Sequence, residues 1–129
     1  MEDQSRIFGR RKSIRLKIIC LAMYTRFDKM GRPADQKPCR TVNLSLGGVK
    51  LQTGFPVNPG EVLDVSMVLG ENSITFKGTV IYVNPSRDED FELGVSIREI
   101  EAADRIALSQ FIYYFNPYSE SDKEREIED

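Results

Sequence analysis

The sequence contains no histidine and no tryptophan, and it has only two cysteines, Cys20 and Cys39. The missing histidine removes the commonest general base and, with so few thiols, the usual ligands of a zinc site. Two cysteines are also too few for the disulfide framework of a small secreted domain, so we expect both thiols to be buried and reduced. We therefore expect no catalytic residues, no metal site and no cofactor, and we do not expect an enzyme.

Long apolar runs are missing as well, and a membrane-spanning helix needs about 20 consecutive apolar residues. The longest candidate, residues 18–23, is short and follows Arg10-Arg11, an order that resembles an export signal. Lys17 interrupts the run upstream, and no small-residue cleavage site follows it. We expect a soluble, cytoplasmic protein that does not insert into membranes.

Charge is nearly balanced overall, with 18 Lys and Arg against 20 Asp and Glu, so no general attraction to nucleic acid is expected. The distribution is uneven, because basic side chains dominate residues 1–17 and acidic ones dominate residues 119–129. Charge-rich termini with few apolar residues are typical of solvated segments. We expect a flexible basic arm over residues 1–14, one folded domain over residues 15–117 and an acidic tail over residues 118–129.

Apolar residues alternate with period two through most of the chain, which predicts a mainly β fold. The expected strands cover residues 15–24, 39–46, 49–51, 61–69, 74–82 and 91–97. In the fifth of these, the row expected to point inward is Ile74, Phe76, Val80 and Tyr82. A helix is expected over residues 101–115, with Asn116-Pro117 as its stop and an apolar stripe made of Leu108, Phe111, Ile112 and Phe115. This order predicts a six-stranded antiparallel β-barrel with a C-terminal α-helix.

The helix needs an apolar surface to cover, and the first expected strand offers one. Ile19, Leu21 and Met23 are apolar on the side of that strand that faces away from the core. Helix docking and a homodimer contact both fit this surface.

Apolar parity changes between the second and third expected strands. The core row of the second strand is Val42, Leu44 and Leu46, whereas Val49 and Leu51 have the opposite parity. Gly47 and Gly48 must therefore absorb a one-residue shift through a bulge or a tight turn. Asn43 and Ser45 lie opposite the core row, so both are aimed at one place outside it.

Two short clusters carry groups suited to binding a guanine nucleotide. Arg11 and Arg15 lie four residues apart, and Asn43, Ser45 and Gly48 follow in the segment Asn43-Leu44-Ser45-Leu46-Gly47-Gly48. Arginine donates in parallel to guanine or phosphate, asparagine donates and accepts, and glycine allows a close backbone approach. The alternatives are a solvated basic flank for the arginines and turn capping for Asn43 and Ser45.

Together the clusters and the barrel-plus-helix pattern resemble the PilZ domain, a bacterial receptor for cyclic di-GMP. Its Arg-x-x-x-Arg motif matches Arg11 to Arg15, and its Asp/Asn-x-Ser-x-x-Gly motif matches Asn43 to Gly48. The resemblance implies that the two arginines close over the ligand while Asn43 and Ser45 hold it from the barrel. The implied ligand-binding set is Arg10, Arg11, Arg15, Asn43, Ser45, Gly47 and Gly48.

The resemblance implies a receptor or adaptor whose N-terminal arm and barrel rim change on binding and regulate an unidentified downstream protein. Arg10, just before the motif, is associated in the family with two intercalated ligand molecules rather than one. Two alternatives stay open: a protein-interaction barrel without nucleotide binding, and a barrel that binds single-stranded nucleic acid.

Overall fold

The structure is a computed structural model that describes residues 15–115. It contains β1 (Leu16–Lys17), β2 (Leu21–Phe27), β3 (Pro33–Leu44), β4 (Gly48–Thr53), β5 (Val62–Leu69), β6 (Asn72–Pro85), the 3₁₀ turn η1 (Arg87–Glu89), β7 (Phe91–Ile100) and α2 (Ala102–Phe115). The mainly β content and the C-terminal helix confirm the predicted class. Within residues 15–115 the helical segments are too short or too polar to cross a bilayer.

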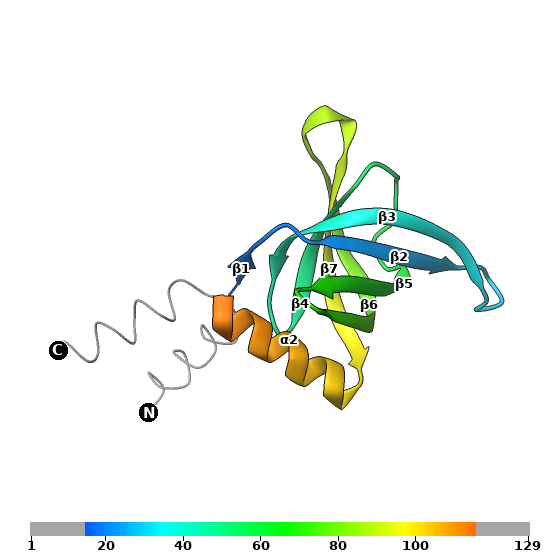
Figure 1. The fold of residues 1–129 in the computed structure, drawn as a ribbon. Coiled ribbons are helices and arrows are strands. Elements are labelled where there is room, and N and C mark those ends of the chain that lie inside the picture. Colours follow the sequence, from blue (N-terminus) through cyan, green and yellow to red (C-terminus); the bar gives the residue numbers. More distant parts are fainter. Residues whose placement is uncertain (1–14, 116–129) are drawn as a thin grey trace, which may run out of the picture.

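Six of the strands form a closed ring (Figure 1). The sheet order is β1-β3-β2-β5-β6-β7-β4, and a further pairing between β3 and β4 closes it. Every pairing is antiparallel, and the two-residue β1 is added at the edge of β3. The inward side chains fill the interior and include Tyr24, Leu51, Leu63, Met67 and Leu93. The predicted six-stranded antiparallel barrel is therefore confirmed.

The first strand is broken where a single continuous strand was expected. Thr41 is fully buried, and its hydroxyl donates to the carbonyl of Ile18 at 2.9 Å and accepts from the amide of Cys20 at 3.0 Å. These bonds hold the chain in a kink between β1 and β2. Both cysteines are free and half-buried, and burial raises the pKa of the Cys39 thiol to about 12.

A shift of register in β3 alters the expected core row. The pairing with β4 slips between Thr41 and Asn43, so Val42 occupies a bulge. Thr41 takes the inward place instead, Val42 is half-buried, and Leu46 lies exposed in the turn that follows. The prediction that Val42, Leu44 and Leu46 share the core face is therefore right only for Leu44.

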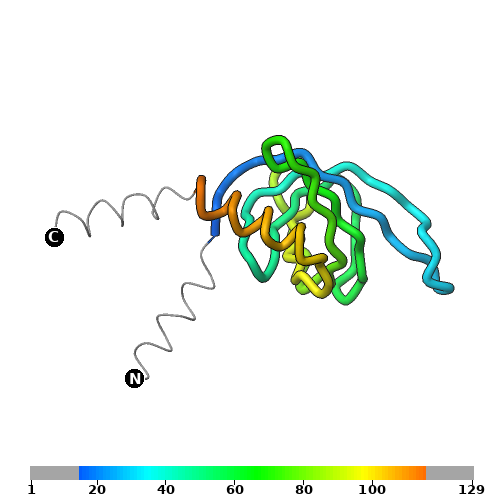
Figure 2. Tube along the Cα trace, turned by 60° about the horizontal axis from the view of Figure 1, so that its bottom comes forward, coloured from blue at the N-terminus to red at the C-terminus, as the bar shows by residue number. Residues whose placement is uncertain are grey.

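Helix α2 packs against the barrel through Leu108 and Ile112, which are buried. In Figures 1 and 2 the helix lies against one side of the barrel, and its C-terminal end is next to the start of β1. Ile19 and Leu21 remain 72% and 77% exposed, so the prediction that the helix docks on them is wrong. The homodimer contact stays a prediction, and the expected stop at Asn116-Pro117 lies outside the described residues.

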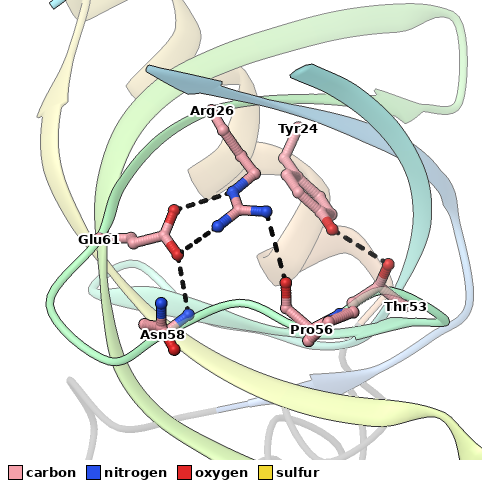
Figure 3. Close-up of polar contacts among 6 residues, drawn as sticks. All are labelled: Tyr24, Arg26, Thr53, Pro56, Asn58 and Glu61. Atoms are coloured by element: carbon pink, nitrogen blue, oxygen red, sulfur yellow. Dashed lines mark hydrogen bonds and ion pairs between the residues drawn. The ribbon is translucent and has the colours of Figure 1, made fainter. Parts of the chain in front are cut away.

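The loop between β4 and β5 is tied to β2 by a bidentate ion pair (Figure 3). Arg26 donates from Nε and Nη2 to the two carboxylate oxygens of Glu61, at 2.9 and 2.7 Å. The backbone amide of Asn58 donates to the same carboxylate at 2.9 Å. Burial alone would raise the pKa of Glu61, but the hydrogen bond from Arg26, that from Asn58 and the guanidinium charge together hold it below its ordinary value.

This lowered pKa makes the stability contributed by Glu61 dependent on pH. A carboxylate whose pKa is lower in the folded state stabilises the fold above its unfolded pKa, and the contribution is lost as pH falls through the folded value. We expect Glu61→Gln to cost about 1–2 kcal/mol at pH 7, an amount typical of charge-assisted hydrogen bonds.

The check is urea unfolding of wild type and Glu61→Gln from pH 7 to pH 3. The difference should shrink as pH falls below about 4.3, the ordinary pKa of glutamate. The exposed Glu71 provides the control, because Glu71→Gln should change stability little at any pH. A wild-type advantage of constant size across this range would contradict the assignment.

Candidate functional site

The segment from Ser45 to Gly48 forms the tight turn that joins β3 to β4. The amide of Ser45 donates to the carbonyl of Gly48 at 2.9 Å. The Ser45 hydroxyl donates to the same carbonyl at 2.9 Å and accepts from the amide of Gly48 at 3.1 Å. The turn absorbs the parity change as predicted, and the turn-capping interpretation of Ser45 is correct. One lone pair of the hydroxyl stays available to accept a further hydrogen bond.

The two glycines of this turn have different steric roles. A methyl group on Gly48 would lie 2.5 Å from the carbonyl oxygen of Val95 on β7. A methyl group on Gly47 would meet no atom within 4 Å. Gly48 is therefore required by the close approach of β4 to β7, which is a backbone requirement independent of any ligand.

Register places one residue from each of four neighbouring strands in a single row on the outer face. Asn43 on β3 lies opposite Lys50 on β4. Lys50 lies opposite Gly94 on β7, and Gly94 lies opposite Tyr82 on β6. The row borders an open cleft of about 350 Å³, within the usual range for small-molecule sites, roughly 300–1,000 Å³.

The cleft collects most of the residues that the sequence singled out. Arg15, Asn43, Ser45, Gly47 and Gly48 all line it. Arg15 comes just before β1, and β1 is held to β3 by the pairs that its two residues form with Leu44 and Asn43. The two remaining candidates, Arg10 and Arg11, lie outside the described residues.

Asn43 carries a polar atom that the described structure leaves unsatisfied. The residue is only 9% exposed, and its Oδ1 atom has no hydrogen-bond partner within residues 15–115. A buried acceptor without a partner costs about 1–3 kcal/mol, so it calls for an explanation such as strain, a functional role, or a bound water or ion. Turn capping does not account for this oxygen, whereas a donor on a ligand in the cleft would.

Sequence reasoning missed the other lining residues, among them Lys50, Ile81 and Tyr82. The prediction that Tyr82 points into the core is wrong, because the β6–β7 register slips between Val80 and Tyr82 and reverses the parity. The Tyr82 ring packs instead over Gly94, in direct contact with the place a Cβ would occupy. Glycine opposite an aromatic residue is a known pairing in β-sheets, so Gly94 in the sequence could have indicated an aromatic side chain packed over it.

The cleft offers donors and acceptors for a planar, anionic ligand. Arg15 and Lys50 supply cationic donors, and Asn43 and Ser45 supply acceptor oxygens. Among residues 15–115 no cluster of three or more potential metal-ligating side chains occurs.

Comparison with known proteins assigns the chain to a family. The model of the PilZ domain matches residues 9–114. A search of curated proteins finds no match.

Solved structures share the fold at low identity. Bacillus subtilis MotI/DgrA, an inhibitor of motility, is 21% identical with a TM-score of 0.64, covering 76% of this chain and 47% of its own. The PilZ domain of Escherichia coli YcgR, solved with cyclic di-GMP, is 12% identical with a TM-score of 0.62, covering 86% and 95%. Apo MrkH from K. pneumonia is 18% identical with a TM-score of 0.65, covering 84% and 52%.

The chain thus spans about half the length of MotI/DgrA and MrkH and nearly the whole of the isolated YcgR domain. The family model covers most of the sequence, and the closed barrel with its C-terminal helix is the fold of these relatives. The chain therefore belongs to the PilZ domain family.

Proposed function

We propose that this protein is a cyclic di-GMP receptor that binds its ligand in the cleft beside the β3–β4 turn. The observation that carries the proposal is the buried, unpartnered Oδ1 of Asn43 in a cleft that Arg15 also lines. Guanine brings an amino group that can donate to this oxygen, and the phosphates bring charge that an arginine can bind bidentately. The PilZ domain of YcgR, solved with cyclic di-GMP, and the MrkH complex support the choice of ligand.

The roles we propose divide between the barrel and the chain that precedes it. Asn43 and Ser45 accept hydrogen bonds from the base, and both are fixed by the β3–β4 hairpin. Arg15 contacts phosphate or stacks on a base from the edge of the cleft. Arg11, as the first arginine of the family motif, and Arg10, just before that motif, belong to the same proposed ligand-binding set.

Binding would regulate a partner protein by changing the surface that the arm and the barrel rim present. A ligand held at once by Arg15 and by the barrel favours arrangements in which the two are close. The size of this shift is limited by the difference in ligand affinity between the arrangements. This is an adaptor function and needs no catalytic group.

Isothermal titration calorimetry with cyclic di-GMP tests the proposal. Wild type should bind, and Arg15→Ala should weaken binding about tenfold or more, because it removes a charge-assisted contact. Arg105→Ala is the matched control, since Arg105 is an exposed arginine on α2 that does not line the cleft. Its affinity should equal that of wild type.

The same titration decides between the proposal and its alternatives. Absence of heat with cyclic di-GMP would leave the protein-interaction barrel as the better description. Binding of single-stranded oligonucleotides that weakens by orders of magnitude with rising salt would indicate a nucleic-acid barrel. Equal affinities for wild type and Arg15→Ala would show that the site is misplaced.

A further inference from the structure

Strand β6 contains a β-bulge where it passes the cleft. Its register with β7 slips between Val80 and Tyr82, so Ile81 is an extra residue in β6. Val80 is buried in the core, whereas Ile81 is 60% exposed and Tyr82 is half-buried. Ile81 and Tyr82 both line the cleft. Bulges are common next to functional sites, where they redirect a side chain, and this one turns an aromatic ring to the outer face.

The Tyr82 ring lies flat against β7. It covers Gly94, the residue opposite Tyr82, which is buried although its neighbours Leu93 and Val95 are the ones that point into the core. Around the place that a Gly94 Cβ would occupy, the nearest ring atom is Cε2, and the two atoms bonded to it, Cδ2 and Cζ, are both 2.6 Å away. A point that close to all three atoms lies over the ring face, because a point beside the ring edge would be farther from Cδ2 and Cζ. One face of the ring therefore rests on the glycine.

The opposite face of the ring is turned away from the sheet, toward the cleft that Tyr82 lines. Within residues 15–115, the ring–ring and cation–ring contacts involve other aromatic residues. The exposed side chain of Ile81 adds apolar surface next to the ring. The outer face of Tyr82 is therefore available to a planar partner.

The ring and the polar side chains border the cleft from different strands. Asn43 is on β3, and the ring lies over β7, two strand spacings or about 10 Å away. A nucleotide base fits both kinds of surface, because its faces stack on aromatic rings and its edge atoms form hydrogen bonds. The cleft thus offers an aromatic surface for the face of a base and the unpartnered acceptor of Asn43 for an edge.

We propose that Tyr82 is a stacking platform for one base of the bound cyclic dinucleotide, held flat by the glycine beneath it. Stacking uses the face that every base has, so this contact adds affinity without choosing between guanine and adenine. The inference rests on the proposed function, because it adds a base-stacking position to the same cleft. The competing role for Tyr82 is a structural one, as a cover for Gly94.

Calorimetry with cyclic di-GMP compares variants that keep or remove the planar ring. Tyr82→Phe keeps the ring and should bind within about twofold of wild type. Tyr82→Leu still covers Gly94 with an apolar side chain but has no planar face, so it should lower affinity about tenfold. Phe55→Leu is the matched control, because Phe55 is a 37% exposed aromatic residue in the β4–β5 loop that does not line the cleft. Its affinity should equal that of wild type.

Fluorescence tests the stacking itself and does not depend on the folding of the leucine variant. The chain has no tryptophan, so Tyr82→Trp carries a single indole, at the proposed platform. Saturating cyclic di-GMP should quench its emission, because a base would lie against the indole face. Phe55→Trp places the indole outside the cleft, and its emission should not change.

The two measurements separate the possible failures. Wild-type affinity in Tyr82→Leu, or binding to Tyr82→Trp without quenching, would overturn the inference and leave Tyr82 as a cover for Gly94. Failure of wild type to bind cyclic di-GMP would instead overturn the proposed function.

Discussion

Replacing Asn43 with leucine should make the domain more stable while it abolishes cyclic di-GMP binding. The Asn43 oxygen is buried without a partner in the described structure, and that costs stability. Leucine is close in size and has no polar atom to leave unsatisfied, so we expect a gain of about 1 kcal/mol. The ligand would lose its acceptor and meet an apolar side chain, which should weaken binding at least about 100-fold.

Chemical unfolding and calorimetry on one preparation check both halves of this expectation. Asn84→Leu is the control, because Asn84 is exposed on β6 and outside the cleft, and it should leave stability and affinity nearly unchanged. A variant that loses stability together with binding would indicate that Asn43 supports the fold. The assignment of its oxygen to the ligand would then be wrong.

Gly48→Ala should destabilise the fold strongly, and Gly47→Ala should not. The added methyl group at Gly48 would meet the Val95 carbonyl at 2.5 Å, and this neighbour is sheet backbone that cannot rotate away. Forcing β4 from β7 should cost about 3 kcal/mol, the upper part of the range for overpacking. At Gly47 the methyl group enters open space, and the less flexible unfolded chain should make the change neutral or slightly stabilising.

Urea midpoints of the two variants measure this contrast. Both substitutions are the same in chemistry and adjacent in sequence, so each controls for the other. If Gly48→Ala does not accumulate as folded protein while Gly47→Ala does, the contrast is upheld. Similar midpoints for the two variants would mean that β4 does not approach β7 as closely as described.

The barrel could be predicted from the sequence because one buried face imposes period-two alternation on every strand. The prediction errors occur where a bulge reverses the alternation of inward and outward side chains and no local sequence feature indicates the bulge. Tyr82 continued an apolar row, but the slip after Val80 turned it outward. The break after β1 depends on the hydroxyl of Thr41, a residue distant in sequence from the strand that it interrupts.

The candidate site could be predicted in part because its motif residues are neighbours in sequence. Asn43, Ser45 and Gly48 lie on one hairpin, so parity alone was enough to bring them together. Lys50 and Tyr82 enter the same cleft only through the register among β3, β4, β6 and β7, which a single sequence does not determine. Their contribution becomes visible only when the strands are paired.

The kink that Thr41 stabilises separates β1 from the six strands that form the barrel, although β1 still pairs with β3. The ring closes through the pairing of β3 with β4, and β1 is not among the strands that complete it. Detaching β1 would remove one pairing neighbour from Leu44 and from Asn43. It would also expose Leu16, whose burial stabilises the fold by about 1.5–3 kcal/mol. The ring would stay intact, so the loss of β1 would be felt first by its two partners on β3, Leu44 and Asn43, at the edge of the cleft.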